Sequence, residues 1–153
     1  RLLKHKKYTI AVAESCTGGG LSRVLTLPSG SSAIYDRGFT VYTNEAKMEL
    51  LDVSAATLQT HGAVSAACAL EMAKGAITHS HADIAISVTG IAGPTGGSIQ
   101  KPVGTIHIGI ATRTLQAFEK KVVLTGGRKH IRRCTISHAL QFILNLLHEQ
   151  QIT

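Results

Sequence analysis

A serine and a threonine stand in a glycine-rich segment that could do chemistry. The segment reads Ala13-Glu14-Ser15-Cys16-Thr17-Gly18-Gly19-Gly20; it follows the β-branched run 8–13 and precedes apolar residues at helical spacing in 21–27. A strand, a glycine turn and a helix in this order aim side chains and free backbone N–H groups into one crevice. Such a crevice suits an anion or a developing oxyanion, so Ser15 and Thr17 are candidate chemical groups. In a second interpretation the hydroxyls only cap the helix and the glycines only make the turn.

A second glycine-rich segment follows another apolar strand pattern. The pattern covers 83–90, and the loop 91–102 after it contains three glycines and two prolines. A connection of this size inside a compact domain is more often functional than not. Because ligands of open α/β sheets bind outside the carboxyl ends of the strands, we expect the loops 15–20 and 89–102 to meet around a common cleft.

The remaining patterns predict the elements that must position these loops. They are a strand at 33–42, a helix at 43–53, a short helix at 54–61, an alanine-rich helix at 65–80, an antiparallel pair of strands at 103–111 and 115–124, and a final amphipathic helix at 131–148. This order predicts an α/β fold, a three-layer αβα sandwich with a central mixed sheet of about five strands. The length of 153 residues predicts a single domain over 1–153.

Composition excludes several classes of protein and of site. Apolar residues make up 44% of the chain and charged residues 16%, a balance typical of a compact globular protein. The three cysteines are widely spaced without a C-x-x-C pair and the histidines form no H-x-x-x-H pair, so neither a disulfide framework nor a metal site is expected. No apolar run reaches the length of a membrane span and no signal-peptide pattern is present, so we expect a cytoplasmic protein.

The net charge of +7 raises the question of a polyanionic partner. The basic residues concentrate at 4–7 and 128–133, and no aromatic residues alternate with them. Stacking platforms for bases are therefore absent from the pattern, which argues against nucleic acid as a partner.

Seven motifs follow one another along almost the whole chain. They are Ala13-Glu14-Ser15-Cys16-Thr17-Gly18-Gly19, Gly30-Ser31-Ser32, Asp36-Arg37-Gly38-Phe39, Tyr42-Thr43-Asn44-Glu45-Ala46-Lys47, His61-Gly62-Ala63-Val64-Ser65, Thr89-Gly90-Ile91-Ala92-Gly93-Pro94 and Lys101-Pro102-Val103-Gly104-Thr105. Together they resemble the CinA carboxyl-terminal domain family, and their order makes the match specific although each motif alone is weak. Only a short basic segment precedes the first predicted strand, so we expect the stand-alone form of that family.

The resemblance implies an activity. Members of the family act as nicotinamide mononucleotide deamidases, amidohydrolases of pyridine-nucleotide recycling that convert nicotinamide mononucleotide to nicotinate mononucleotide and ammonia. The implied partner is thus a small-molecule pyridine nucleotide, with no cofactor, and the implied assembly is a homo-oligomer, a dimer or larger.

Catalytic residues follow from the same resemblance. By motif match the serine nucleophile is Ser15 and its lysine partner is Lys47, with Tyr42 nearby. A buried lysine has a lowered pKa and can serve as the base that activates a serine hydroxyl. Without the resemblance, Lys47 would be interpreted as a solvated helix lysine and Tyr42 as a core residue.

Binding of the nucleotide needs donors for its phosphate, and arginine is suited to bidentate contact with that group. The glycine-rich loops and the nearby polar and basic side chains supply the candidates. The predicted substrate-binding residues are Thr17, Gly18, Gly19, Ser31, Ser32, Thr89, Gly90, Gly93, Lys101, Arg128 and Arg132.

The sequence departs from the family pattern at three positions. Gly20 stands where an aromatic residue is common, Ala66 where an acidic residue is common, and Gly127 where Gly-Asp-Arg would place an aspartate. A catalytically inactive nucleotide-binding or regulatory paralogue therefore stays open, and release of ammonia from nicotinamide mononucleotide distinguishes the enzyme from it. A less favoured alternative, an accessory protein of DNA uptake, depends on the competence association of the family and on the basic charge, and a salt-dependent shift with DNA would be needed to support it.

Overall fold

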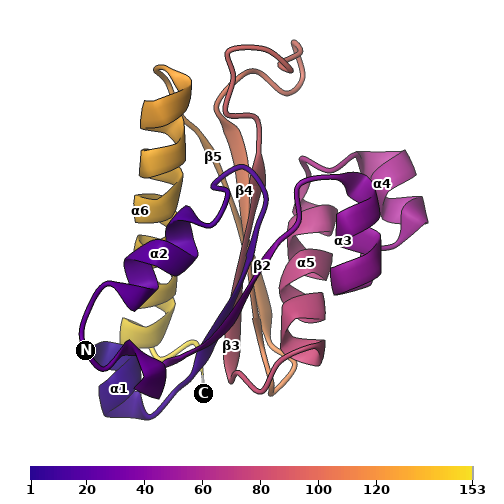
Figure 1. Cartoon of the computed structure of the whole chain (residues 1–153). Coiled ribbons are helices and arrows are strands. Elements are labelled where there is room, and N and C mark those ends of the chain that lie inside the picture. The colour runs from indigo at the N-terminus through magenta and orange to yellow at the C-terminus, as the bar shows by residue number, and fades with distance from the viewer. Residues whose placement is uncertain (153) are drawn as a thin grey trace.

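The computed structural model describes residues 1–152 and arranges them in three layers, with helices on both faces of a central sheet (Figure 1). The strands are β1 (Ile10–Glu14), β2 (Tyr35–Thr40), β3 (Ile84–Gly90), β4 (Thr105–Thr112) and β5 (Ala117–Val123). Their order in the sheet is β2-β1-β3-β4-β5; β1 pairs in parallel with β2 and β3, while β4 pairs antiparallel with β3 and β5. The predicted α/β fold with a five-stranded mixed sheet is confirmed.

Helices lie on both sides of the sheet (Figure 1). On one side lie α1 (Leu2–Lys6), α2 (Gly20–Thr26) and α6 (Arg128–His148); on the other lie α3 (Asn44–Leu51), α4 (Ala55–His61) and α5 (Ala66–Thr78). A short 3₁₀ helix, η1 (Ser31–Ala33), precedes β2. No helix within residues 1–152 has the length and apolar character needed to cross a membrane.

Most element boundaries differ from the sequence prediction by one or two residues, and three differences have a clear cause. The basic lead forms α1, whose five residues are too few to show a helical period. The strand predicted at 33–42 is shorter, because η1 occupies its start. The last helix begins at Arg128 rather than 131. The sequence pattern missed its first turn because that turn carries only basic side chains before the first apolar residue, Ile131.

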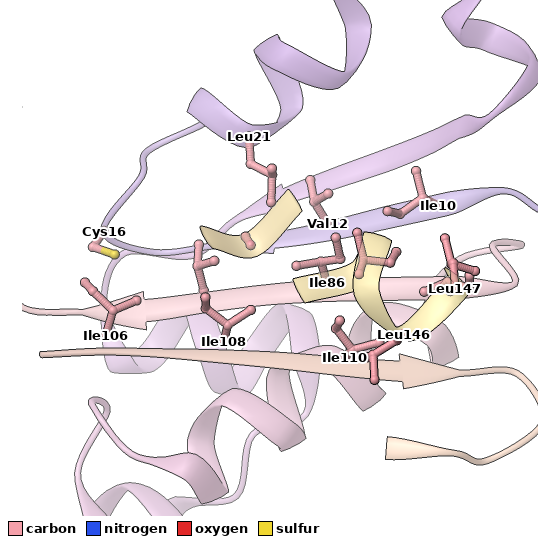
Figure 2. Close-up of a cluster of buried hydrophobic side chains, with 14 of the residues drawn as sticks. Ile10, Val12, Cys16, Leu21, Ile86, Ile106, Ile108, Ile110, Leu146 and Leu147 are labelled. Atoms are coloured by element: carbon pink, nitrogen blue, oxygen red, sulfur yellow. The ribbon is translucent and has the colours of Figure 1, made fainter. Parts of the chain in front are cut away.

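Side chains of different size cover the two faces of the sheet. Successive residues of a strand point to opposite faces; β1 alternates isoleucine or valine with alanine, and β3 alternates them with alanine, serine and threonine. The large side chains pack towards α2 and α6 in one apolar cluster (Figure 2). The alanines face α5, which therefore lies very close to the sheet: a Cβ added to Gly109 of β4 would stand 2.4 Å from the carbonyl oxygen of Ala69.

The register of β1 and β3 determines where the two glycine-rich loops begin. Glu14 at the end of β1 is paired with Val88 of β3. Since the two strands are parallel, Ser15 and Thr89 emerge at the same edge of the sheet.

The close contact of α3 with α5 gives a test of this packing. A Cβ on Gly75 would lie 1.9 Å from the carbonyl oxygen of Leu51, so Gly75→Ala should lower the free energy of unfolding by about 1–3 kcal/mol. In an unobstructed helix the same change would instead raise it by about 0.5–1 kcal/mol. Urea denaturation measures the sign, and Lys74→Ala at the exposed neighbouring position is the control. Stabilisation by Gly75→Ala would contradict the contact.

Candidate active site

Ser15 is the first residue after β1 and begins the turn that leads into α2. Its N–H donates to the carbonyl oxygen of Val88 at 3.1 Å, and its own carbonyl accepts from the N–H of Gly18 at 3.1 Å. Gly18 and Gly19 have φ values of 56° and 90°, in the left-handed region that glycine enters without steric cost. The predicted order of strand, glycine turn and helix is therefore confirmed around Ser15.

Lys47 lies in α3 and points its amine at Ser15. The Nζ atom is 3.2 Å from Ser15 Oγ, and the lysine is only 2% exposed. Thr43 caps this helix through its hydroxyl. The other contacts of Nζ are the carbonyl oxygens of Val41 at 3.2 Å and Tyr42 at 3.3 Å. Three neutral oxygens thus surround the amine.

Burial lowers the pKa of Lys47 from the ordinary value of 10.5, because the ammonium form loses its hydration. Among residues 1–152, no carboxylate oxygen lies within 4.0 Å of its amine. Burial raises the pKa of the neighbouring Cys16 and Cys68 thiols to about 11, so at pH 7 they are uncharged. The surroundings of Lys47 therefore favour the neutral amine.

A cavity of about 210 Å³ opens beside these two groups. It lies where the segments after β1 and β3 meet the connection between α4 and α5, as the sequence predicted for the loops 15–20 and 89–102. Its lining residues are Ser15, Cys16, Tyr42, Asn44, Lys47, Ala63, Val64, Thr89, Gly90, Ala92 and Arg128.

Tyr42 and Arg128 meet at the cavity. The Tyr42 side chain is 60% exposed, and its hydroxyl accepts a hydrogen bond from Arg128 Nη2 at 3.0 Å. Arg128, the first residue of α6, also donates from Nη1 to the carbonyl oxygen of Gly93 at 2.9 Å. The Tyr42 hydroxyl thus contacts an arginine rather than Ser15, and only its backbone carbonyl touches Lys47.

Four of the predicted substrate-binding residues either belong to the turn after β1 or form hydrogen bonds with it. Thr17 is buried and its hydroxyl donates to a carboxylate oxygen of Glu14. Arg132 donates from Nε to the carbonyl oxygen of Cys16 and from Nη2 to that of Thr17, both at 3.1 Å. A Cβ on Gly18 would lie 3.0 Å from Arg132 Nη2. Thr17, Gly18, Gly19 and Arg132 are therefore brought together beneath Ser15.

Two further predicted residues fasten the neighbouring loops. Thr89 donates its hydroxyl to the carbonyl oxygen of Ala63 at 2.8 Å, which joins β3 to the start of the α4–α5 connection. Lys101 donates from Nζ to the carbonyl oxygen of His61 at 2.6 Å. That bond ties the long loop 91–104 to the last residue of α4.

Ser31 and Ser32 lie elsewhere. They belong to η1, which directly precedes the amino end of β2, and the adjoining Ile34 carbonyl accepts from the N–H of Ile10 at the first residue of β1. Because β1 and β2 are parallel, this is the edge of the sheet opposite to Ser15. Within one chain the structure does not bring Ser31 and Ser32 to the cavity.

The family model of the CinA C-terminal domain matches residues 1–147. The chain belongs to the CinA C-terminal domain family. Among solved structures of that superfamily, a Klebsiella pneumoniae protein has a TM-score of 0.93 at 36% identity, covering 97% of this chain and 92% of that one. The competence/damage inducible protein CihA of Agrobacterium tumefaciens has a TM-score of 0.91 at 44% identity, covering 94% and 88%.

Two kinds of relative share the CinA C-terminal domain with this chain. The nicotinamide-nucleotide amidohydrolase PncC of Escherichia coli K12 is 45% identical over 139 residues, which are 91% of this chain and 84% of that protein. A competence-damage inducible protein of Caldicellulosiruptor bescii is 51% identical over 143 residues, which are 93% of this chain. The chain spans only 34% of the length of the second relative.

The three departures from the CinA family pattern do not line the cavity. Gly20 begins α2, where a Cβ would meet the side chain of Ile136 on α6 at 2.8 Å. Ala66 is the first residue of α5, and Gly127 caps α6 directly before Arg128. None of these three positions takes part in the hydrogen bond between Lys47 and Ser15.

Sequence reasoning missed several residues of the site. Asn44 lines the cavity, and Ala63 and Val64 line it from the α4–α5 connection, although the sequence patterns indicated no role for these three residues beyond membership of a motif. Glu14 was part of the motif without a function, yet its carboxylate is fully buried. A charged residue at the end of an apolar strand was the available signal, because such a group needs partners inside the protein.

The burial of Lys47 predicts a gain in stability when the amine is removed. At a pH below this lowered pKa, the lysine is protonated in both the folded and the unfolded chain, and burying its charge opposes folding. Between that pKa and 10.5 the unfolded chain binds more protons, so stability rises with pH. Lys47→Met should therefore raise the urea midpoint at pH 7, with a gain that shrinks as the pH approaches 10.5. Lys74→Met, at an exposed position of α5, should show no such pH dependence.

Proposed function

We propose that this chain is a nicotinamide mononucleotide amidase, which hydrolyses the carboxamide of its substrate to nicotinate mononucleotide and ammonia. One observation carries the proposal: the buried amine of Lys47 lies 3.2 Å from Ser15 Oγ at the edge of a cavity. The name of the E. coli relative, a nicotinamide-nucleotide amidohydrolase, supplies the substrate class. No cofactor is needed, and a homo-oligomer in the cytoplasm belongs to the same proposal.

The contacts of Lys47 suit a general base. A neutral amine has two N–H donors and one lone pair, and the carbonyl oxygens of Val41 and Tyr42 accept two donated hydrogens. The lone pair is then left for the hydroxyl proton of Ser15. Lowering the pKa of the lysine by burial increases the neutral fraction that can accept this proton.

The reaction proceeds through an acyl-enzyme. Ser15 Oγ attacks the carboxamide carbon while Lys47 takes its proton, and the ammonium of Lys47 then returns a proton to the leaving nitrogen, which departs as ammonia. A water molecule attacks the resulting ester while Lys47 accepts a proton from it. Lys47 then returns this proton to Ser15 Oγ as the ester C–O bond breaks, which releases the acid product and regenerates the serine hydroxyl and the neutral lysine. The backbone N–H of Cys16, next to the nucleophile, is the proposed oxyanion donor.

The size of the cavity supports a proposal for which part of the substrate it holds. Sites that enclose a drug-sized ligand have volumes of about 300–1,000 Å³, whereas this cavity has about 210 Å³. It therefore suits the pyridine carboxamide, with ribose and phosphate extending outside. Arg128, whose guanidinium already stands at the cavity beside the Tyr42 hydroxyl, is the proposed phosphate donor.

Removal of the nucleophile gives the first test. Ser15→Ala should reduce ammonia release from nicotinamide mononucleotide to background without loss of folding, since the hydroxyl contributes little to stability. A coupled ammonia assay and circular dichroism measure the two properties. Ser137→Ala, on an exposed face of α6, is the matched control and should keep wild-type activity. Ser15→Ala with activity within a few-fold of wild type would sink the proposal.

Replacement of the base gives the second test. Lys47→Arg keeps the positive charge but cannot supply a neutral nitrogen, so it should be nearly inactive. In the wild type, the acid limb of the pH profile of kcat/KM should report an apparent pKa below 10.5, because only the deprotonated lysine is active. Lys74→Arg on the exposed side of α5 is the control. If Lys47→Arg kept most of the activity, the lysine would serve to bind charge and another base would be required.

A further inference from the structure

Glu14 is a buried carboxylate that the proposed reaction does not use. It is the last residue of β1, directly before Ser15, and its side chain is completely excluded from solvent. Within residues 1–152, no lysine, arginine or histidine forms an ion pair with it. Burying an unpaired charge is costly, so the carboxylate must be compensated by hydrogen bonds.

Four donors compensate this carboxylate, and they come from both sides of the glycine turn. On the near side Thr17 Oγ1 lies 2.5 Å from Oε2. On the far side the N–H of Leu21 lies 2.8 Å from Oε2, and both the N–H and the hydroxyl of Ser22 lie 2.7 Å from Oε1. Glu14 therefore ties the start of the turn to the first residues of α2.

A second group holds the same turn from α6. Arg132 binds the carbonyl oxygens of Cys16 and Thr17 at 3.1 Å each. The two segments are more than a hundred positions apart in the chain, so this contact depends on tertiary packing. The Glu14 carboxylate accepts from a side chain of the turn and from amides at the start of α2, while the Arg132 guanidinium donates to carbonyl oxygens of the turn. The backbone around Ser15 is therefore held from two sides.

We propose that Glu14 is a positioning residue, which holds the turn so that Ser15 Oγ stays within reach of Lys47. The proposal rests on the proposed function of those two residues. Glu14 itself touches neither the cavity nor the Lys47 amine. Its effect is geometric: a displacement of the nucleophile by about 1 Å is enough to cost about 10²-fold in rate.

Glu14→Gln is the decisive variant because it keeps the size of the side chain but replaces one acceptor oxygen with an NH₂ group. That NH₂ faces backbone N–H donors and cannot accept from them. We expect kcat for ammonia release to fall about 10²-fold, with KM within about threefold of wild type. A role in substrate binding would raise KM instead.

The chain contains a matched control. Glu71 also accepts hydrogen bonds from a serine N–H and a threonine hydroxyl at the start of a helix, those of Ser54 and Thr57 at α4. Glu71→Gln makes the same chemical change at a helix that carries no nucleophile, so it should keep the wild-type kcat. A comparable fall of kcat in both variants would show a general effect of destabilisation and would overturn the proposal.

A readout independent of the substrate separates this proposal from the proposed function. The rate at which a fluorophosphonate labels Ser15, measured by mass spectrometry of the peptide, depends on the Ser15 and Lys47 geometry and not on the nucleotide. Slow labelling of Glu14→Gln beside normal labelling of Glu71→Gln supports the proposal even if nicotinamide mononucleotide is not the substrate. Equal labelling rates in these two variants and the wild type would overturn it.

Thr17→Val keeps the test decisive if Glu14→Gln fails to fold. It removes one of the four donors and retains the shape of the side chain, with Thr57→Val as its counterpart on Glu71. Thr17→Val should lower kcat and slow labelling while KM and the unfolding midpoint change no more than in Thr57→Val. Unchanged kcat in Thr17→Val would contradict the positioning role.

Discussion

Keeping the amine of Lys47 out of water, without a counter-charge, is the constraint on which the site depends. Its nearest polar neighbours are two carbonyl oxygens and the Ser15 hydroxyl, and the adjacent thiols stay protonated. A carboxylate in this place would hold the lysine in its charged form, in which the lone pair of the nitrogen already carries a proton. The helix α3 that carries Lys47 packs closely on α5, at a glycine that leaves no room for a Cβ.

Two buried ionisable side chains, Lys47 and Glu14, lie near Ser15, and their hydrogen-bond partners are of opposite kinds. Lys47 is surrounded by acceptors that a neutral amine can satisfy. Glu14 is surrounded by four donors that a carboxylate can satisfy. Since the two groups are not paired with each other, the proton exchange proposed between Lys47 and Ser15 does not involve Glu14, whose proposed role is to hold the backbone of the turn.

Elements from both ends of the chain complete the site. Arg128 and Arg132 stand four residues apart on one face of α6. The first reaches Tyr42 and the loop after β3, and the second reaches the turn after β1. The apolar side chains of the sheet that pack against α6 (Figure 2) set the position from which both arginines reach the carboxyl edge.

Local patterns in the sequence by themselves determined the strand, turn and helix around Ser15 and the order of elements that predicts an α/β sheet. These features depend on neighbours in the chain, so a single sequence contains them. Tertiary structure alone decided that Arg132 is engaged with backbone carbonyls, that Tyr42 faces Arg128, and that Ser31 and Ser32 lie at the opposite edge from the cavity. It also decided the partners of Glu14 and the loss of water around Lys47. Burial and hydrogen-bond partners arise when segments far apart in the chain pack together, and spacing along the sequence does not encode those distances.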